Sequence, residues 1–223
     1  MYHIFVDLEM QDRERQFKLA SNGLRNEVIE FGAVVLDDDF KEIGSYKKYV
    51  KPEFSRGMQA RFIALTGITD SMIQSANKFE YVLEDFCNWC LQYGDDICFY
   101  EWSDSDLAQL LKEAKRKCIE LSDKEKQVLK NWQDVQRMYG EAVDSRTQIA
   151  LETAVWTFGE RFLGRAHDAV NDARNTGRVY AMLQNQKDRA MAKQMLHHGT
   201  TETSIGFTLA DVFDFSKLQL AIG

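Results

Sequence analysis

Two carboxylates near the start of the chain are spaced so that both could bind the same cation. Asp7 and Glu9 fall at the end of an apolar run rich in strand-forming residues, which predicts a β-strand over residues 2–8. Side chains alternate along a strand, so residues two apart project together from one face. Like charges this close repel unless a cation lies between them, and oxygen ligands suit Mg²⁺ or Mn²⁺. Taken alone, the pair is better explained as a solvated strand end.

Two later segments offer further carboxylates and a histidine. Asp104 and Asp106 follow a short apolar run at 97–100, and open α/β folds place their sites at such strand ends. Helix capping explains the same two residues equally well. Farther on, His167 stands five residues before Asp172, and Asp168 can cap the helix that begins there. A histidine before a helix is usually structural, so this pair is also weak evidence by itself.

The elements that would position these residues follow from the hydrophobic pattern. Short β-rich runs predict strands early in the chain and one later buried strand, and recurrence near 3.6 residues predicts helices between and after them. We interpret 11–26 as a mobile loop and the bend at 66–69 as a link between short helices. The expected strands are 2–8, 28–36, 43–50 and 97–100, and the main expected helices are 79–90, one opening at 107–114, 150–162 and 168–184.

Composition restricts the classes of protein that fit. The 223 residues carry 28 Lys and Arg against 35 Asp and Glu, a net charge of −7, which argues against a protein that coats duplex DNA. No apolar run approaches the ~20 residues of a membrane helix, and the first residues lack the pattern of a secretion signal. Four cysteines are too few for a disulfide scaffold. We therefore expect a cytoplasmic α/β protein with no membrane partner.

The order of the acidic residues and the histidine is far more specific than any one of them. The chain resembles the DEDDh 3′–5′ exonucleases of the DnaQ-like, RNase H-like superfamily, and within it the Eri/3′hExo-like and KapD-like branch. The resemblance covers about residues 1–185. It rests on the segments Ile4–Glu9, Glu27–Val34, Tyr49–Pro52, Leu65–Thr69, Trp102–Asp106 and Gly164–Thr176.

The resemblance implies an RNase H-like mixed sheet, three antiparallel strands and then parallel strands, flanked by helices. It implies that the metal-binding carboxylates are Asp7, Glu9, Asp106 and Asp172, with His167 as general base. Asp106 is preferred over Asp104 because the family has a large apolar residue four positions after its acid, and Leu110 fits that spacing. The implied cofactors are two Mg²⁺ (or Mn²⁺).

A substrate pocket is also implied. The bend at Thr66 would form a wall for the 3′-terminal nucleotide, with Leu8 and Leu65 as apolar contacts for the last base. The family stacks an aromatic side chain from its second motif on that base. Ser105 stands at the expected position, so Trp102 is the candidate replacement.

The leading hypothesis is a metal-dependent 3′–5′ exonuclease that hydrolyses single-stranded nucleic acid, RNA favoured over DNA, to 5′-mononucleotides. The alternatives are a catalytically idle, regulatory or nucleic-acid-binding member of the same fold, and an unrelated α/β carboxylate–metal enzyme. An unperturbed imidazole titrates near pH ~6.5, which suits a general base near neutrality.

Three other features of the sequence have plausible structural roles. Cys87 and Cys90 form a C-x-x-C inside a predicted amphipathic helix, which favours buried core thiols over a redox motif. The basic segment 112–117 fits a solvated helix face and a guide for the substrate strand about equally. Residues 186–223 lie outside the exonuclease domain predicted for 1–185. We expect this C-terminal extension to pack on the domain or on a partner.

Overall fold

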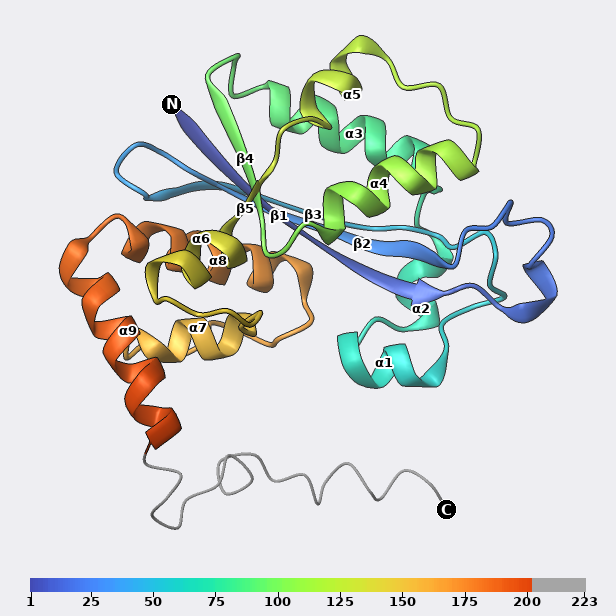
Figure 1. Ribbon diagram of the computed structural model, residues 1–223. Helices are drawn as coiled ribbons and strands as arrows, with labels where there is room; N and C mark the ends of the chain where they lie inside the picture. The colour runs from blue at the N-terminus through green and yellow to red at the C-terminus, as the bar shows by residue number, and fades with distance from the viewer. Residues whose placement is uncertain (202–223) are drawn as a thin grey trace, which may run out of the picture.

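A five-stranded mixed sheet runs through the centre of the computed structural model, which describes residues 1–201 (Figure 1). Its strand order is β3-β2-β1-β4-β5, antiparallel across β3, β2 and β1 and parallel across β1, β4 and β5. This confirms the expected α/β fold with three antiparallel strands and then parallel ones. The strands are β1 (Tyr2–Asp12), β2 (Asn26–Leu36), β3 (Glu42–Tyr49), β4 (Ile97–Glu101) and β5 (Gln133–Asp134).

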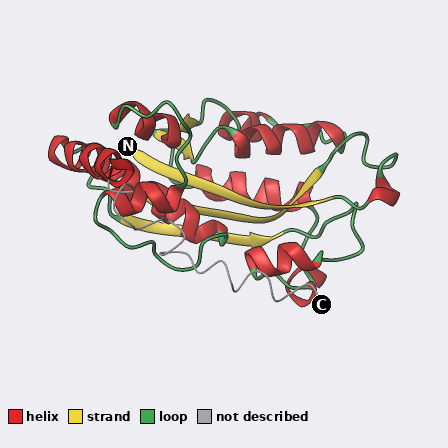
Figure 2. Cartoon of the chain, turned by 60° about the horizontal axis from the view of Figure 1, so that its bottom comes forward, coloured by secondary structure: helices red, strands yellow, loops and turns green. Residues whose placement is uncertain are grey.

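Helices cover both faces of this sheet, which Figure 2 shows as a layer of strands between helices. They are the 3₁₀ turn η1 (Arg15–Phe17), α1 (Ala60–Thr66), α2 (Asp70–Gln74), α3 (Phe79–Leu91), α4 (Ser105–Arg116), α5 (Asp123–Val128), α6 (Val135–Ala142), α7 (Leu151–Thr157), α8 (Ala169–Leu183) and α9 (Gln186–Thr201).

The alternation of β1 divides the core into two layers. Ile4, Val6 and Leu8 face α3, α4 and α5 in one cluster, which also buries Cys87 and Cys90 of α3. Phe5 faces the opposite way and packs with residues of α6, α7, α8 and α9. A smaller third cluster joins α1 and α2 to β2. Odd-numbered residues of β1 therefore project toward α8, and this decides where the carboxylates go.

The first strand is longer than its sequence predicts. β1 does not end at Leu8 but continues to Asp12, past an irregularity where Glu9 pairs with Glu30 and Met10 pairs with Val28. Ile29 is the extra residue of this bulge, and it packs into the third cluster. The expected loop at 11–26 is thus shortened at both ends. Bulges of this kind redirect side chains and often lie beside functional sites.

Two helical segments also differ from expectation. The helix predicted for 150–162 ends at Thr157, because Gly159 adopts a positive φ of 72° that stops the turn. The helix predicted from 168 begins at Ala169, with Asp168 as its cap. β5, α5 and α6 lie between 119 and 149, where hydrophobic periodicity predicted no element.

The C-terminal extension begins with α9, which packs on α7 and α8 and buries Ala192 and part of Leu196. Residues 202–223 of this extension lie outside the described residues, so their packing stays a prediction. Among residues 1–201, no helix has the length and apolarity that crossing a bilayer requires.

Candidate active site

Asp7 and Glu9 lie within β1, on the face that α8 covers, and not at a strand end. Glu9 pairs with Glu30 across β2, and Asp7 pairs with Gly32. Glu9 is 6% exposed, whereas Asp7 is half-buried. The strand therefore presents two carboxylates side by side in a place where little water reaches them.

Gly32 lets the start of α8 approach these carboxylates. A Cβ on this glycine would lie 2.2 Å from the carbonyl carbon of Ala169 and 2.3 Å from the nitrogen of Val170. Real side chains do not make such contacts, so only glycine permits this crossing of helix and strand. Because Gly32 pairs with Asp7, the first turn of α8 lies over the part of the sheet that carries the two carboxylates.

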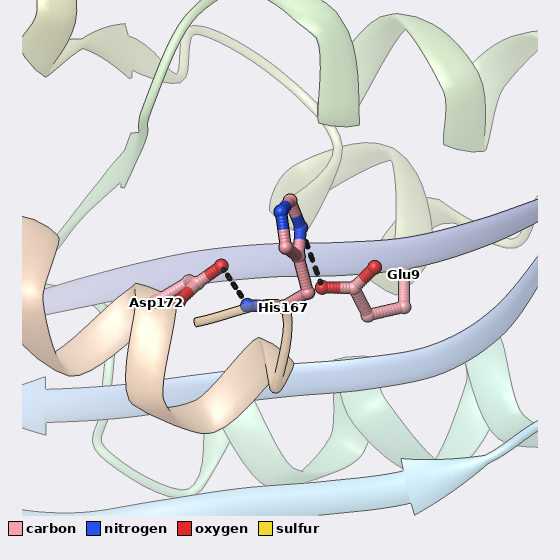
Figure 3. A group of neighbouring side chains, drawn as sticks. All are labelled: Glu9, His167 and Asp172. Atoms are coloured by element: carbon pink, nitrogen blue, oxygen red, sulfur yellow. Dashed lines mark hydrogen bonds and ion pairs between the residues drawn. The ribbon is translucent and has the colours of Figure 1, made fainter. Parts of the chain in front are cut away.

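The residues before α8 complete a cluster with Glu9 (Figure 3). The side chain of Asp168 accepts a hydrogen bond from the Asn171 N–H and caps the helix. His167 has a left-handed backbone with φ of 61°, and its N–H donates to Asp172 Oδ2 over 3.1 Å. Its Nδ1 lies 3.9 Å from Glu9 Oε1, and its side chain is 52% exposed. The imidazole thus stands at the open side of the cluster.

Asp106 enters from the first turn of α4 and is 4% exposed, whereas Asp104 is exposed. The structure thus favours Asp106 as the buried member of this pair. Asp104 occupies the N-cap position but makes no capping hydrogen bond. Glu101, at the end of β4, accepts hydrogen bonds from the N–H groups of Asp106 and Leu107 through one oxygen, each over 2.9 Å. Glu101 therefore fixes the helix start that carries Asp106.

Several carboxylates lie close together in this region, and their pKa values are raised. Burial first, and then the charges of Asp106 and Asp172, raise the pKa of Asp7 well above its usual value. Burial, and then Asp172 and Glu30, raise the pKa of Glu9 to about 8. The pKa of Asp106 is likewise raised well above its usual value by burial and by neighbouring carboxylates.

Asp172 follows the same pattern. Burial raises its pKa to about 7 against the opposing hydrogen bond from the His167 N–H. Its Oδ1 is buried, and no hydrogen-bond donor within the described part of the chain reaches it. One ligand atom each from Glu9, His167 and Asp172 can lie within 4.8 Å of the others. Buried, mutually repelling oxygens with an unused lone pair fit a hard divalent cation.

A lysine supports this arrangement from the edge of the sheet. Lys47 Nζ on β3 lies 2.8 Å from Glu30 Oε1 and 2.6 Å from Asp168 Oδ2. Glu30 is 1% exposed, and its other oxygen accepts from the Ala169 N–H over 3.3 Å. Lys47 therefore joins β2 and β3 to the cap of α8, immediately beside His167.

The four predicted substrate contacts are placed in different surroundings. Leu65, at the end of α1, is 44% exposed, whereas Leu8 is 5% exposed and lies in the core cluster on the opposite face of β1. Thr66 is 6% exposed, and its hydroxyl donates to the Phe62 carbonyl. Trp102 is half-buried with its ring centroid 6.1 Å from that of Tyr139. Of the four, Leu65 has the largest exposed fraction.

Arg165 joins the predicted pocket wall to the loop before α8. Its guanidinium donates to the carbonyls of Ala64 and Leu65, each over 2.9 Å. Sequence reasoning assigned no role to Arg165, Glu101 or Lys47. Arg165 stands inside the Gly164–Thr176 segment already singled out, so its proximity to His167 was available as a signal. Glu101 and Lys47 carry no local signal, because their partners come from other elements.

A mixed sheet of this strand order, with carboxylates clustered on its central strand, places the chain in the RNase H-like class of α/β proteins. Residues 4–180 match the family described as Exonuclease (RNase T). The chain belongs to this exonuclease family, which confirms the resemblance inferred from the motifs.

Curated relatives carry exoribonuclease names. The chain is 32% identical over 170 residues to ERI1 exoribonuclease 2 of Danio rerio, covering 67% of this chain and 30% of that protein. It is 26% identical over 180 residues to 3′-5′ exoribonuclease 1 of Rattus norvegicus, covering 78% and 51%. The chain thus spans about a third to a half of the length of these relatives.

Solved structures show the same fold. The nuclease domain of 3′hExo, described as a DEDDh family member bound to rAMP, superposes with a TM-score of 0.70 at 23% identity, over 82% of this chain and 92% of that one. Cell-death related nuclease 4 (CRN-4) gives a TM-score of 0.68 at 22% identity, over 82% and 64%.

Proposed function

We propose that this chain is a metal-dependent 3′–5′ exonuclease that hydrolyses single-stranded nucleic acid, RNA in preference to DNA, to 5′-mononucleotides. One observation carries the proposal: Asp7, Glu9, Asp106 and Asp172 converge from β1, α4 and α8 with raised pKa values, and His167 stands exposed beside them. Membership of the exonuclease family and the exoribonuclease names of relatives support it.

The four carboxylates would hold two Mg²⁺ (or Mn²⁺). Asp106, Asp172 and Glu9 each contribute to the raised pKa of Asp7, so Asp7 would hold an ion together with these neighbours. Bound divalent ions of this kind lower the pKa of a water and neutralise charge on a phosphodiester. Such cations would favour the ionised forms of all four side chains, because burial otherwise favours their protonated forms.

His167 acts as the general base. Its exposed imidazole accepts the proton of the attacking water, the new bond forms between that water oxygen and phosphorus, and the bond from phosphorus to the 3′-oxygen of the preceding nucleotide breaks. The phosphate stays on the 5′-oxygen of the released mononucleotide, and the 3′-oxygen of the shortened strand takes up a proton from solvent. The hydrogen bond from the His167 N–H to Asp172, together with the Asp168 cap, fixes the loop that carries the ring.

The 3′-terminal nucleotide would lie between α1 and the loop before α8. Leu65 offers an exposed apolar surface there, and the Arg165 guanidinium ties the end of α1 to the catalytic loop. Thr66 shapes the bend of this wall through its hydrogen bonds to Phe62 and Ile68. Trp102 is the aromatic candidate for the base contact on the β4 side.

The test is a digestion of matched single-stranded RNA, single-stranded DNA and hairpin RNA, each labelled at the 5′ end, in Mg²⁺ and in EDTA. We expect Mg²⁺-dependent ladders that shorten from the 3′ end, release of 5′-mononucleotides, and a faster rate on single-stranded RNA. Asp106→Asn should abolish turnover, and the matched control Asp104→Asn should keep it. Binding without turnover in the unaltered chain would instead support the catalytically idle alternative.

A further inference from the structure

Six exposed cations gather on one side of the molecule, and we call them the basic patch. Three come from the connection between β1 and β2, and three come from the second half of α4. Within residues 1–201, no carboxylate lies within ion-pair distance of any of them. They are Arg15, Lys18, Arg25, Lys112, Lys115 and Arg116.

The two contributing segments touch each other. Asn22 Nδ2 donates to the carbonyl of Arg116 over 3.4 Å. The Arg116 guanidinium also lies against Gly23, because a Cβ built there would be 3.7 Å from its Cζ. Figure 1 shows the β1–β2 connection at the right edge of the molecule, next to the end of α4. The two segments that carry the six cations therefore adjoin.

This concentration of positive charge stands out against the rest of the chain. The net charge of the protein is −7, yet residues 13–25 contain four basic side chains and a single acidic one, Glu14. Glu14 is itself engaged by the Ser55 hydroxyl and the Arg56 N–H. On α4, Glu113 is buried and paired with Lys117 over 2.9 Å, so it does not offset the exposed cations.

The basic patch begins close to the carboxylate cluster. Asp106 lies in the first turn of α4, and Lys112, Lys115 and Arg116 follow it on the same helix. At 1.5 Å per residue, these three lie roughly 9, 14 and 15 Å along the helix axis from Asp106. A few nucleotides of extended strand span this distance. A strand whose 3′ end occupies the active site can therefore continue along α4.

We propose that the basic patch binds phosphates of the substrate strand on the 5′ side of the terminal nucleotides, so that it forms a track for single-stranded RNA. The proposal rests on the exonuclease function proposed above, and it adds a second contact region outside the catalytic cluster. Unpaired cations attract phosphates by releasing counterions, which makes such binding depend on salt and on strand length. A substrate too short to reach the patch gains nothing from it.

The experiment compares the unaltered full chain with Lys115→Gln/Arg116→Gln and with a matched control, Arg146→Gln/Lys187→Gln. The control removes the same charge from exposed residues, and Lys187 lies on α9, across the molecule from the patch (Figure 1). Substrates are a trinucleotide and an unstructured 12-nucleotide RNA. The readouts are KM and kcat in Mg²⁺, and binding of the 12-mer in Ca²⁺ at several salt concentrations.

We expect the Lys115→Gln/Arg116→Gln variant to raise KM and Kd for the 12-mer on the order of tenfold near 0.15 M salt, because two phosphate contacts are lost. The slope of log affinity against log salt should fall by about 1.4. Trinucleotide turnover, kcat and the control should stay within twofold. A second variant on the other segment, Lys18→Gln/Arg25→Gln, should repeat the effect even if the α4 variant is misfolded.

Unchanged 12-mer binding in both patch variants would overturn the proposal, and so would an equal loss on trinucleotide and 12-mer. If the unaltered chain cleaves neither RNA in Mg²⁺, the proposed exonuclease function fails. The Ca²⁺ binding arm then still decides whether the patch holds a strand. The two proposals are therefore tested separately.

Discussion

The raised pKa of Glu9 predicts that the metal-free protein is destabilised as pH rises. Glu9 has a pKa of about 8 in the folded chain against 4.5 for the free side chain. A carboxyl whose pKa is raised by folding stabilises the fold fully below pH 4.5, and this contribution is lost as pH rises through about 8. Glu9→Gln mimics the protonated form at every pH, so it should stabilise the metal-free protein at high pH.

The size of this effect follows from the two pKa values. Compared with a side chain that stays protonated, Glu9 lowers the free energy of unfolding by about 1 kcal/mol at pH 5 and about 4 kcal/mol at pH 8. The difference in free energy of unfolding between Glu9→Gln and the unaltered chain should therefore rise by about 3 kcal/mol from pH 5 to pH 8. For a chain of this length that gain raises Tm by roughly 6–12 °C.

The assay is thermal unfolding at pH 5 and pH 8, in EDTA and in saturating Mn²⁺, with Glu120→Gln as an exposed control. In EDTA, Glu9→Gln should exceed the unaltered chain in Tm mainly at pH 8. In Mn²⁺ the order should reverse, because the unaltered chain keeps all its ligands and gains stability by binding the ion. A Glu9→Gln variant that is less stable than the unaltered chain at pH 8 in EDTA would refute the reasoning about repulsion.

Three further substitutions test the site. His167→Ala should lower single-turnover cleavage by on the order of 10²–10⁴ while oligonucleotide binding in Ca²⁺ stays within twofold, and a loss of binding would contradict the base role. Glu101→Ala leaves two N–H groups of α4 without their acceptor, so chemical denaturation should show a loss of about 1–3 kcal/mol that Glu101→Gln largely restores. Gly32→Ala places a methyl group 2.2 Å from the carbonyl carbon of Ala169, so α8 must move. That variant should lose about 1–3 kcal/mol and most of its Mg²⁺-dependent turnover, and wild-type activity would show that the close crossing is not required.

Local pattern in the sequence determined much of this protein. Alternation placed Asp7 and Glu9 on one face of β1, and periodicity predicted α3 with Cys87 and Cys90 buried inside it. The five-residue spacing from His167 to Asp172 brings the two residues together in the structure, because both lie at the start of one helix and the His167 N–H donates to Asp172. These features depend on neighbours along the chain, which is why a single sequence reveals them.

Tertiary structure decided the features that depend on distant partners. β1 extends past Glu9 only because β2 pairs with it through a bulge, and Leu8 is buried because α3–α5 cover its face. Glu101 and Lys47 support the site through backbone groups and carboxylates that lie on other elements. A side chain's partner across a sheet or between helices depends on how the layers pack. The hydrophobic periodicity along the chain does not show which elements pack together.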